Sequence, residues 1–194
     1  MFLALKLHKT YRAASYLCIL LLCGLTGWLL VYSLILEAGN IAVSGCKKVG
    51  FYNYCLNNKT GTGCFCISQL EDLRKEGVAF PQGLLVPLVM IYSSLIMFLT
   101  GTLTLCFSMY FKERFLWLFA FFFNVLSLMG IYLGLLLYLL GTMALIDVSE
   151  LSSGFLALLG AMLGLALLSY ITRREANQVY EKNCSGPQIY SLMI

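Results

Sequence analysis

The sequence predicts an all-α polytopic membrane protein: a four-transmembrane-helix bundle with a small disulfide-stapled extracellular β element in the first loop. The 194-residue chain is 60% hydrophobic and 11% charged, whereas soluble domains are about 45–50% apolar and about 25% charged. Four stretches without a charged side chain are each long enough to cross a hydrocarbon core of about 30 Å as a helix. Four of the eight cysteines lie in the polar segment between the first two of these stretches.

The apolar stretches set the expected helix bounds. The four transmembrane helices are expected at residues 13–36, 83–107, 115–145 and 154–171. The first follows a basic segment, as the core of a signal peptide would, but such cores span only about 7–15 residues. Because this apolar stretch is longer, we interpret it as an uncleaved transmembrane helix.

The distribution of Lys and Arg predicts that both termini face the cytoplasm. Eight basic residues lie in the N-terminal segment 1–12, the short loop 108–114 and the tail 172–194. The other five lie in the long loop 37–82, and the second loop on that side, 146–153, has none. Short basic segments stay cytoplasmic, so both of these loops are expected outside, in a protein that reaches the plasma membrane through the secretory pathway. The expected partner of the inner basic residues is the lipid bilayer, and no segment indicates binding to nucleic acid.

The first extracellular loop holds an even set of cysteines, namely Cys46, Cys55, Cys64 and Cys66. Outside the cell cysteines pair, and four of them can pair in three ways. We favour a Cys55–Cys64 bridge that closes a hairpin with a glycine-rich tip. Cys46 and Cys66 flank this hairpin, and they would either pair at its base or stay free thiols. A metal site is not favoured, because the loop has no His and a Cys-x-Cys pair alone is a weak signal.

A glycosylation sequon lies at the expected tip of this hairpin. Asn58 begins Asn58-Lys59-Thr60, and an acceptor of this kind is modified where it is exposed outside the cell. A second match at Asn183 falls in the cytoplasmic tail, and we expect it to stay unmodified.

The transmembrane stretches carry no Asp, Glu, Lys, Arg or His. Intramembrane charges usually mark ion or substrate paths, so their absence disfavours a pump or a coupled transporter. Asn124 is the one strong polar group at depth, and we expect it to form an interhelical hydrogen bond rather than a ligand site. Two Gly-x-x-x-Gly faces, Gly130 with Gly134 and Gly160 with Gly164, are expected to pack helices within the bundle.

The cytoplasmic side carries two candidates for palmitoylation, Cys106 at the end of the second helix and Cys184 in the tail. A buried packing residue is the alternative for Cys106. The chain ends in Leu192-Met193-Ile194, a form that some PDZ domains accept by strand addition.

The first loop also contains a longer pattern, Gly50-Phe51-Tyr52-Asn53-Tyr54-Cys55, followed by Cys64. This pattern resembles the Gly-Leu-Trp-x-x-Cys…Cys signature of the claudin-like four-helix family, which includes peripheral myelin proteins and calcium-channel γ subunits. The resemblance implies a small antiparallel sheet held by a bridge between Cys55 and Cys64. It also places Phe51 and Tyr52 at the positions of the signature Leu and Trp.

A closer resemblance covers nearly the whole chain. Its motifs are Leu36-Glu37-Ala38-Gly39-Asn40, the Gly50-to-Cys55 segment, and Gly154-Phe155-Leu156-Ala157-Leu158 at the start of the last helix. With these motifs the chain resembles the transmembrane protein 140 family.

We expect a non-enzymatic membrane organiser that contacts other membrane proteins, in cis or in trans, through its extracellular loop. An auxiliary subunit of a channel or receptor is the alternative. A membrane thiol–disulfide oxidoreductase is disfavoured, because such enzymes need an active Cys-x-x-Cys pair and the loop has only Cys64-Phe65-Cys66. The single histidine, His8, has no nucleophile at a recognisable spacing. No catalytic residue, cofactor or metal is expected.

The sequon gives a first test of the orientation. A glycosidase should increase the gel mobility of the protein from cells, and this shift should disappear in Asn58→Gln and persist in Asn183→Gln. A shift that persists in Asn58→Gln would place the glycan, and with it this loop, elsewhere.

Overall fold

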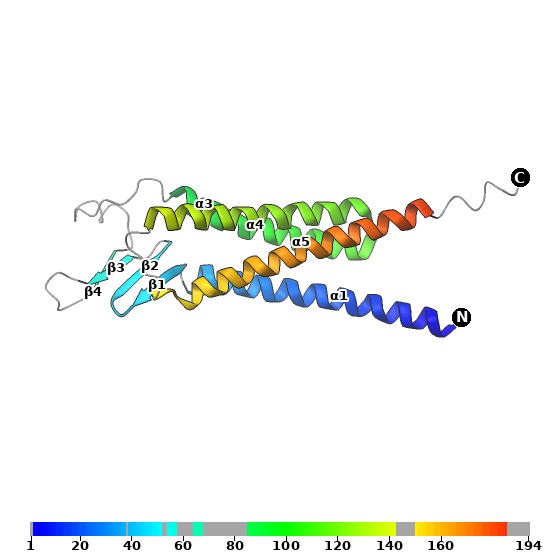
Figure 1. Ribbon diagram of the computed structural model, residues 1–194, viewed down its shortest axis with the longest axis horizontal. Coiled ribbons are helices and arrows are strands. Elements are labelled where there is room, and N and C mark those ends of the chain that lie inside the picture. The colour runs from blue at the N-terminus through cyan, green and yellow to red at the C-terminus, as the bar shows by residue number, and fades with distance from the viewer. Residues whose placement is uncertain are drawn as a thin grey trace, which may run out of the picture.

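The computed structural model describes residues 2–37, 39–51, 54–57, 64–67, 85–142 and 150–185. Its helices are α1 (Phe2–Val31), the π-helical turn η1 (Tyr32–Leu36), α3 (Leu85–Phe111), α4 (Arg114–Thr142) and α5 (Ser153–Ser185). Its strands are β1 (Asn40–Ser44), β2 (Lys47–Gly50), β3 (Tyr54–Asn57) and β4 (Cys64–Ile67). The helices form a long bundle with the sheet at one end, and the start of α1 and the end of α5 lie at the other (Figure 1).

Four helical segments are long and apolar enough to cross a membrane, which confirms the prediction of a multi-pass membrane protein. They are Ala14–Leu36, Leu85–Phe111, Arg114–Thr142 and Ser153–Glu181. Leu and Phe side chains remain exposed along all four; Leu21, Leu103, Phe122 and Leu163 are each more than half exposed. Lipid is the environment in which so much apolar surface can remain exposed. A helix suits that environment because its backbone groups are hydrogen-bonded within the helix.

Two helices extend by more than ten residues beyond their expected stretches. α1 begins at Phe2, and α5 continues past Ile171 to Ser185. The segment after Ile171 contains no glycine or proline before Gly186-Pro187, and its Arg, Glu, Ala and Gln residues favour helix. It is also packed, since Thr172 and Ala176 are fully buried. The polar segment that follows Ile171 therefore begins as a helix.

The helices do not pack as a symmetric bundle. α3 and α4 run side by side, and α5 lies between α4 and α1 (Figure 1). The turn between α3 and α4 is only two residues long, and Lys112 adopts a positive φ of 56° there. Its amide donates to the carbonyl of Ser108 at 2.9 Å, which closes the end of α3.

The first Gly-x-x-x-Gly face lies against α3. A Cβ on Gly134 would come within 2.6 Å of Cγ1 of Ile91, and one on Gly130 would come within 3.2 Å of Cβ of Ser94. Side chains at these positions would push the two helices apart, so both glycines permit the close α3–α4 approach.

The second such face lies against α1. A Cβ on Gly160 would come within 3.2 Å of Cδ1 of Leu29, and one on Gly164 would overlap the hydroxyl of Thr26. Both glycine pairs therefore face other helices of the same chain.

Asn124 is buried in α4, where it faces Gly101 of α3. The hydrogen bond between these two helices comes from a neighbouring residue: the hydroxyl of Ser127, one turn further, donates to the carbonyl of Ser94 at 2.9 Å. Ser127 is thus a donor across this interface, and the interhelical hydrogen bond expected of Asn124 itself stays a prediction.

The four strands form an antiparallel sheet in the order β1-β2-β3-β4. Burial along β1 does not alternate residue by residue, because Ile41 and Ala42 are both buried where the register shifts between Asn40 and Ala42. Ala42 and Val49 are paired and buried, whereas Val43 and Lys48 are paired and exposed. These two neighbouring pairs lie on opposite faces of the sheet, one toward the bundle and one away from it.

Candidate functional site

The junction between the sheet and the bundle begins where the first span ends. After η1, Gly39 adopts a positive φ of 63°, and its amide donates to the carbonyl of Ser33 at 3.1 Å. A Cβ at this position would lie 2.6 Å from Cδ2 of Phe51. Glycine is therefore required at position 39 for two reasons, its backbone conformation and the ring beside it.

Gly50 and Phe51 attach the end of β2 to the bundle. The amide of Phe51 donates to the carbonyl of Gly39 at 3.1 Å. The Tyr138 hydroxyl of α4 donates to the carbonyl of Gly50 at 2.8 Å, and its ring meets the Phe51 ring edge to face at 4.8 Å. Phe51 and Tyr138 are 6% and 1% exposed. Because Phe51 is buried among bundle residues, it serves as the anchor of the sheet.

Gly50 must itself lack a side chain. A Cβ there would lie 2.7 Å from Oδ1 of Asn40 and 3.0 Å from the carbonyl oxygen of Gly39. The two ends of the β1–β2 pair can therefore approach each other only with glycine at position 50.

The start of α5 completes the junction and pairs with β1. The Ser152 hydroxyl donates to the carbonyl of Asn40 at 2.5 Å, and the Ser152 amide donates to the carbonyl of Ile41 at 2.9 Å. The Ser152 Oγ also accepts from the amide of Phe155 at 3.2 Å, as in an N-cap. A Cβ on Gly154 would come within 3.0 Å of the carbonyl oxygen of Asn40. The edge of β1 is thus covered, as an edge strand needs to be.

Polar side chains surround this contact. Lys47 of β2 forms an ion pair with Glu150 at 2.6 Å, and both side chains are partly buried. Glu37 accepts a hydrogen bond from the Tyr32 hydroxyl at 2.8 Å. From α3, the Tyr92 hydroxyl donates to the carbonyl of Leu34 at 2.9 Å. All four long helices or their flanking residues therefore contribute to the junction.

The three motifs that the sequence contained separately meet at this place. Gly39 and Asn40 come from the first motif, Gly50 and Phe51 from the second, and Gly154 from the third, with the contacts described above. An added Cβ at any of these three glycines would lie within 3.0 Å of an atom of another segment.

Tyr138, Glu150 and Ser152 were not expected from the sequence. A tyrosine near the end of an apolar helix is typical of a membrane interface, and nothing in the sequence pairs Glu150 with a lysine 103 residues earlier. The Ser-Ser-Gly segment before the last apolar stretch was a usable N-cap signal for Ser152.

The register of the β3–β4 hairpin bears on the cysteines. Cys55 lies opposite Cys66, and Cys64 lies opposite Asn57. Cys55 is buried. Side chains of Cys64 and Cys66 lie outside the described residues, so the Cys55–Cys64 pairing stays a prediction.

Of the remaining predicted sites, Cys106 alone has both its backbone and its side chain among the described residues. Cys106 is an exposed free thiol on α3, so its palmitoylation stays a prediction. Asn58, Tyr52, the side chain of Cys184 and the C-terminal segment 192–194 lie outside the described residues.

The described residues also include no group of three or more His, Cys, Asp or Glu placed to hold a metal ion.

The Tyr138 hydroxyl gives a direct test of the junction. Tyr138→Phe removes one oxygen and leaves the buried Gly50 carbonyl without this donor, which should lower the free energy of unfolding by about 1–3 kcal/mol. Tyr132→Phe is the matched control, because Tyr132 lies on the same helix but is half exposed. Thermal unfolding in detergent should show a lower midpoint for Tyr138→Phe alone; equal effects of both substitutions would contradict the role of this hydrogen bond.

A comparison with known proteins agrees with the position of these motifs. Residues 8–185 match the model of the TM140 protein family. No curated protein sequence matches the chain. The matched region contains the junction and all four candidate spans. The chain is therefore a multi-pass membrane protein that belongs to the TM140 protein family.

Proposed function

We propose that this protein is a non-enzymatic, claudin-like organiser that binds another membrane protein through the outward face of its sheet. The observation that carries this proposal is the division of the sheet into a fixed face and a free face. Ala42, Val49 and Phe51 are buried toward the bundle, while Val43 and Lys48 remain exposed as a cross-strand pair. A surface that is held rigid before binding loses little conformational entropy when a partner docks.

The orientation of this face follows from charge. With the excess of Lys and Arg in segments 1–12, 108–114 and 172–194, the sheet lies outside the cell and both termini lie in the cytoplasm. We propose the plasma membrane as the site of action. A sheet on that surface can contact a partner in the same membrane or in the next cell.

Disulfide bonds are part of the proposal. We propose that Cys46, Cys55, Cys64 and Cys66 staple the sheet, and support comes from Cys46 and Cys55, each of which is disulfide-bonded. This bonding state fits the oxidising side of a membrane. The spacing favours Cys55–Cys64, whereas the register, with Cys66 opposite Cys55, favours Cys55–Cys66. Either pairing joins β3 to β4.

The composition of the spans supports a role without catalysis. The apolar stretches 13–36, 83–107, 115–145 and 154–171 contain no Asp, Glu, Lys, Arg or His, and charged groups of that kind usually carry proton, ion or substrate chemistry in a membrane. The contacts of the junction instead position a surface.

The outward face can be tested without disturbing the junction. The double variant Val43→Asp/Lys48→Glu changes two exposed side chains, so it should reach the cell surface at the normal level and lose most of its neighbours in proximity labelling. Lys112→Glu, a charge reversal at the opposite end of the bundle, is the control and should keep them. A channel or receptor among the lost neighbours would identify the protein as an auxiliary subunit.

Two results would overturn the proposal. One is an unchanged set of neighbours for the sheet variant. The other is a loss of the same neighbours in Lys112→Glu, which would place recognition at the other end of the molecule.

A further inference from the structure

The two middle helices carry a longer exposed apolar surface than the other two. On α3, exposed apolar side chains run from Leu85, which is 66% exposed, to Phe111, which is 58% exposed. These 27 residues rise by about 39 Å. On α4, the exposed apolar side chains run from Phe115 to Leu140, a rise of about 38 Å. An ordinary hydrocarbon core is only about 30 Å thick.

The first and last helices fit such a core more closely. The apolar part of α1, Ala14–Leu36, rises by about 33 Å. On α5, the exposed side chains of Arg173 and Arg174 follow Ser153 after a rise of about 30 Å. The bundle therefore has two apolar lengths, and they differ by about 6–9 Å.

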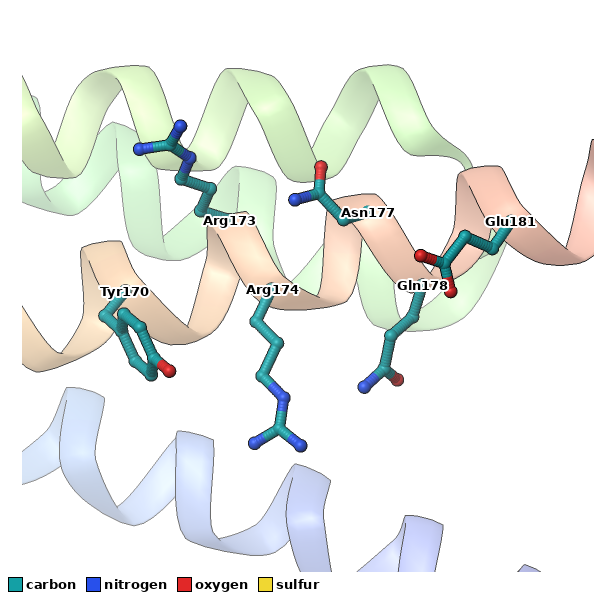
Figure 2. Close-up of a pocket in the computed structure, with 6 residues that line it drawn as sticks. All are labelled: Tyr170, Arg173, Arg174, Asn177, Gln178 and Glu181. Carbon is teal, nitrogen blue, oxygen red and sulfur yellow. The ribbon is translucent and has the colours of Figure 1, made fainter.

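The difference lies at the end of the bundle far from the sheet. The Arg114 guanidinium carbon lies 4.1 Å from the centre of the Tyr180 ring, so the charged turn between α3 and α4 is level with Tyr180. Arg173 precedes Tyr180 on α5 by about 10 Å. The α3–α4 hairpin runs beside this whole stretch of α5 (Figure 2). It thus continues for about 10 Å beyond the level at which α5 becomes charged.

Aromatic side chains cover the hairpin between these two levels. Phe107, Tyr110, Phe111 and Phe115, here called the aromatic tip, are each more than half exposed. Their rings are short and apolar, whereas the long stems of the two α5 arginines can carry their charges toward the headgroups. A thick bilayer therefore accommodates both groups, but a thin one would leave the aromatic tip in water. The hairpin sets the thickness that fits the protein.

A tilt of the whole bundle does not remove the difference. A stretch of about 39 Å fits a core of about 30 Å only at a tilt of about 40°, the upper limit for transmembrane helices. The four long helices all run along the long axis of the molecule (Figure 1). The same tilt would therefore shorten the projection of the apolar part of α1 to about 25 Å. One pair of helices is mismatched in a thin bilayer at any tilt.

We propose that the lipid-facing surface of the α3–α4 hairpin binds a bilayer with a thick hydrocarbon core, such as one of long-chain phosphatidylcholine. Core thickness differs between membranes, and the core of the plasma membrane is a few Å thicker than that of the endoplasmic reticulum. The preference agrees with the location proposed above. It does not depend on a partner of the sheet, because no residue of the outward sheet face takes part in it.

Quenching of tryptophan fluorescence by brominated phosphatidylcholine tests this preference in the full-length protein. The native Trp28 of α1 is 60% exposed and reports the lipid beside the shorter helices. In Trp28→Phe/Tyr132→Trp the exposed indole lies on α4 and reports the lipid beside the hairpin, while the buried Trp117 is common to both proteins. The probes are mixtures of dioleoyl and dierucoyl phosphatidylcholine with one of the two brominated. The hairpin reporter should bind the longer lipid about twofold more tightly, and Trp28 should show no such preference.

Two further variants of the hairpin reporter separate apolar length from aromatic character. Phe111→Lys/Phe115→Lys moves the charged boundary of the hairpin about 6 Å toward the sheet and should abolish the preference. Phe111→Leu/Phe115→Leu keeps the apolar length and should preserve it.

Four results would overturn the proposal. They are equal binding of the two lipids at the hairpin reporter, an equal preference at Trp28, retention of the preference in the lysine variant, and its loss in the leucine variant. The first two comparisons leave the aromatic tip unchanged, so they decide the matter even if the lysine variant does not fold.

Discussion

The attachment of the sheet to the bundle depends on close contacts at three glycines, Gly39, Gly50 and Gly154. At each of them a Cβ would fall about 3 Å or less from an atom of a neighbouring segment. This approach brings the carbonyls of Asn40 and Gly50 within reach of the hydroxyls of Ser152 and Tyr138. The hydrogen bonds and the burial of Phe51 therefore follow from the absence of three side chains. A small sheet, which would be marginal alone, becomes an extension of the helical core.

The same arrangement explains how a membrane protein with few polar residues can present a defined surface. The pairing of Ser152 and Leu151 with β1 covers one edge of the sheet. The ion pair between Lys47 and Glu150 adds little stability at a partly exposed position, about 0–1 kcal/mol, but it links β2 to the segment before α5. The outward pair of Val43 and Lys48 remains exposed.

Much of this architecture follows from the sequence, because the membrane imposes simple rules. Long uncharged stretches identify the four helices, and the Gly130/Gly134 and Gly160/Gly164 spacings indicate which faces pack. The end of α5 required a different signal: after Ile171 the first helix-breaking residues are Gly186-Pro187, so the helix continues beyond the apolar stretch. The contact between Tyr138 and Gly50 spans 88 residues, and no local pattern encodes it. The register that sets Cys55 opposite Cys66 likewise depends on three-dimensional pairing.

Hydrogen exchange tests the central claim, that the glycine contacts hold the sheet to the bundle, most directly. In the full-length protein in nanodiscs, amides of residues 39–51 should exchange slowly, and Ser44→Ala should leave this protection intact. Gly50→Ala should raise the exchange rate of the same segment roughly tenfold or more, since overpacking of this kind costs about 1–3 kcal/mol. Fast exchange of this segment in the unmodified protein, or equal protection in Gly50→Ala, would show that the sheet is not held by these contacts.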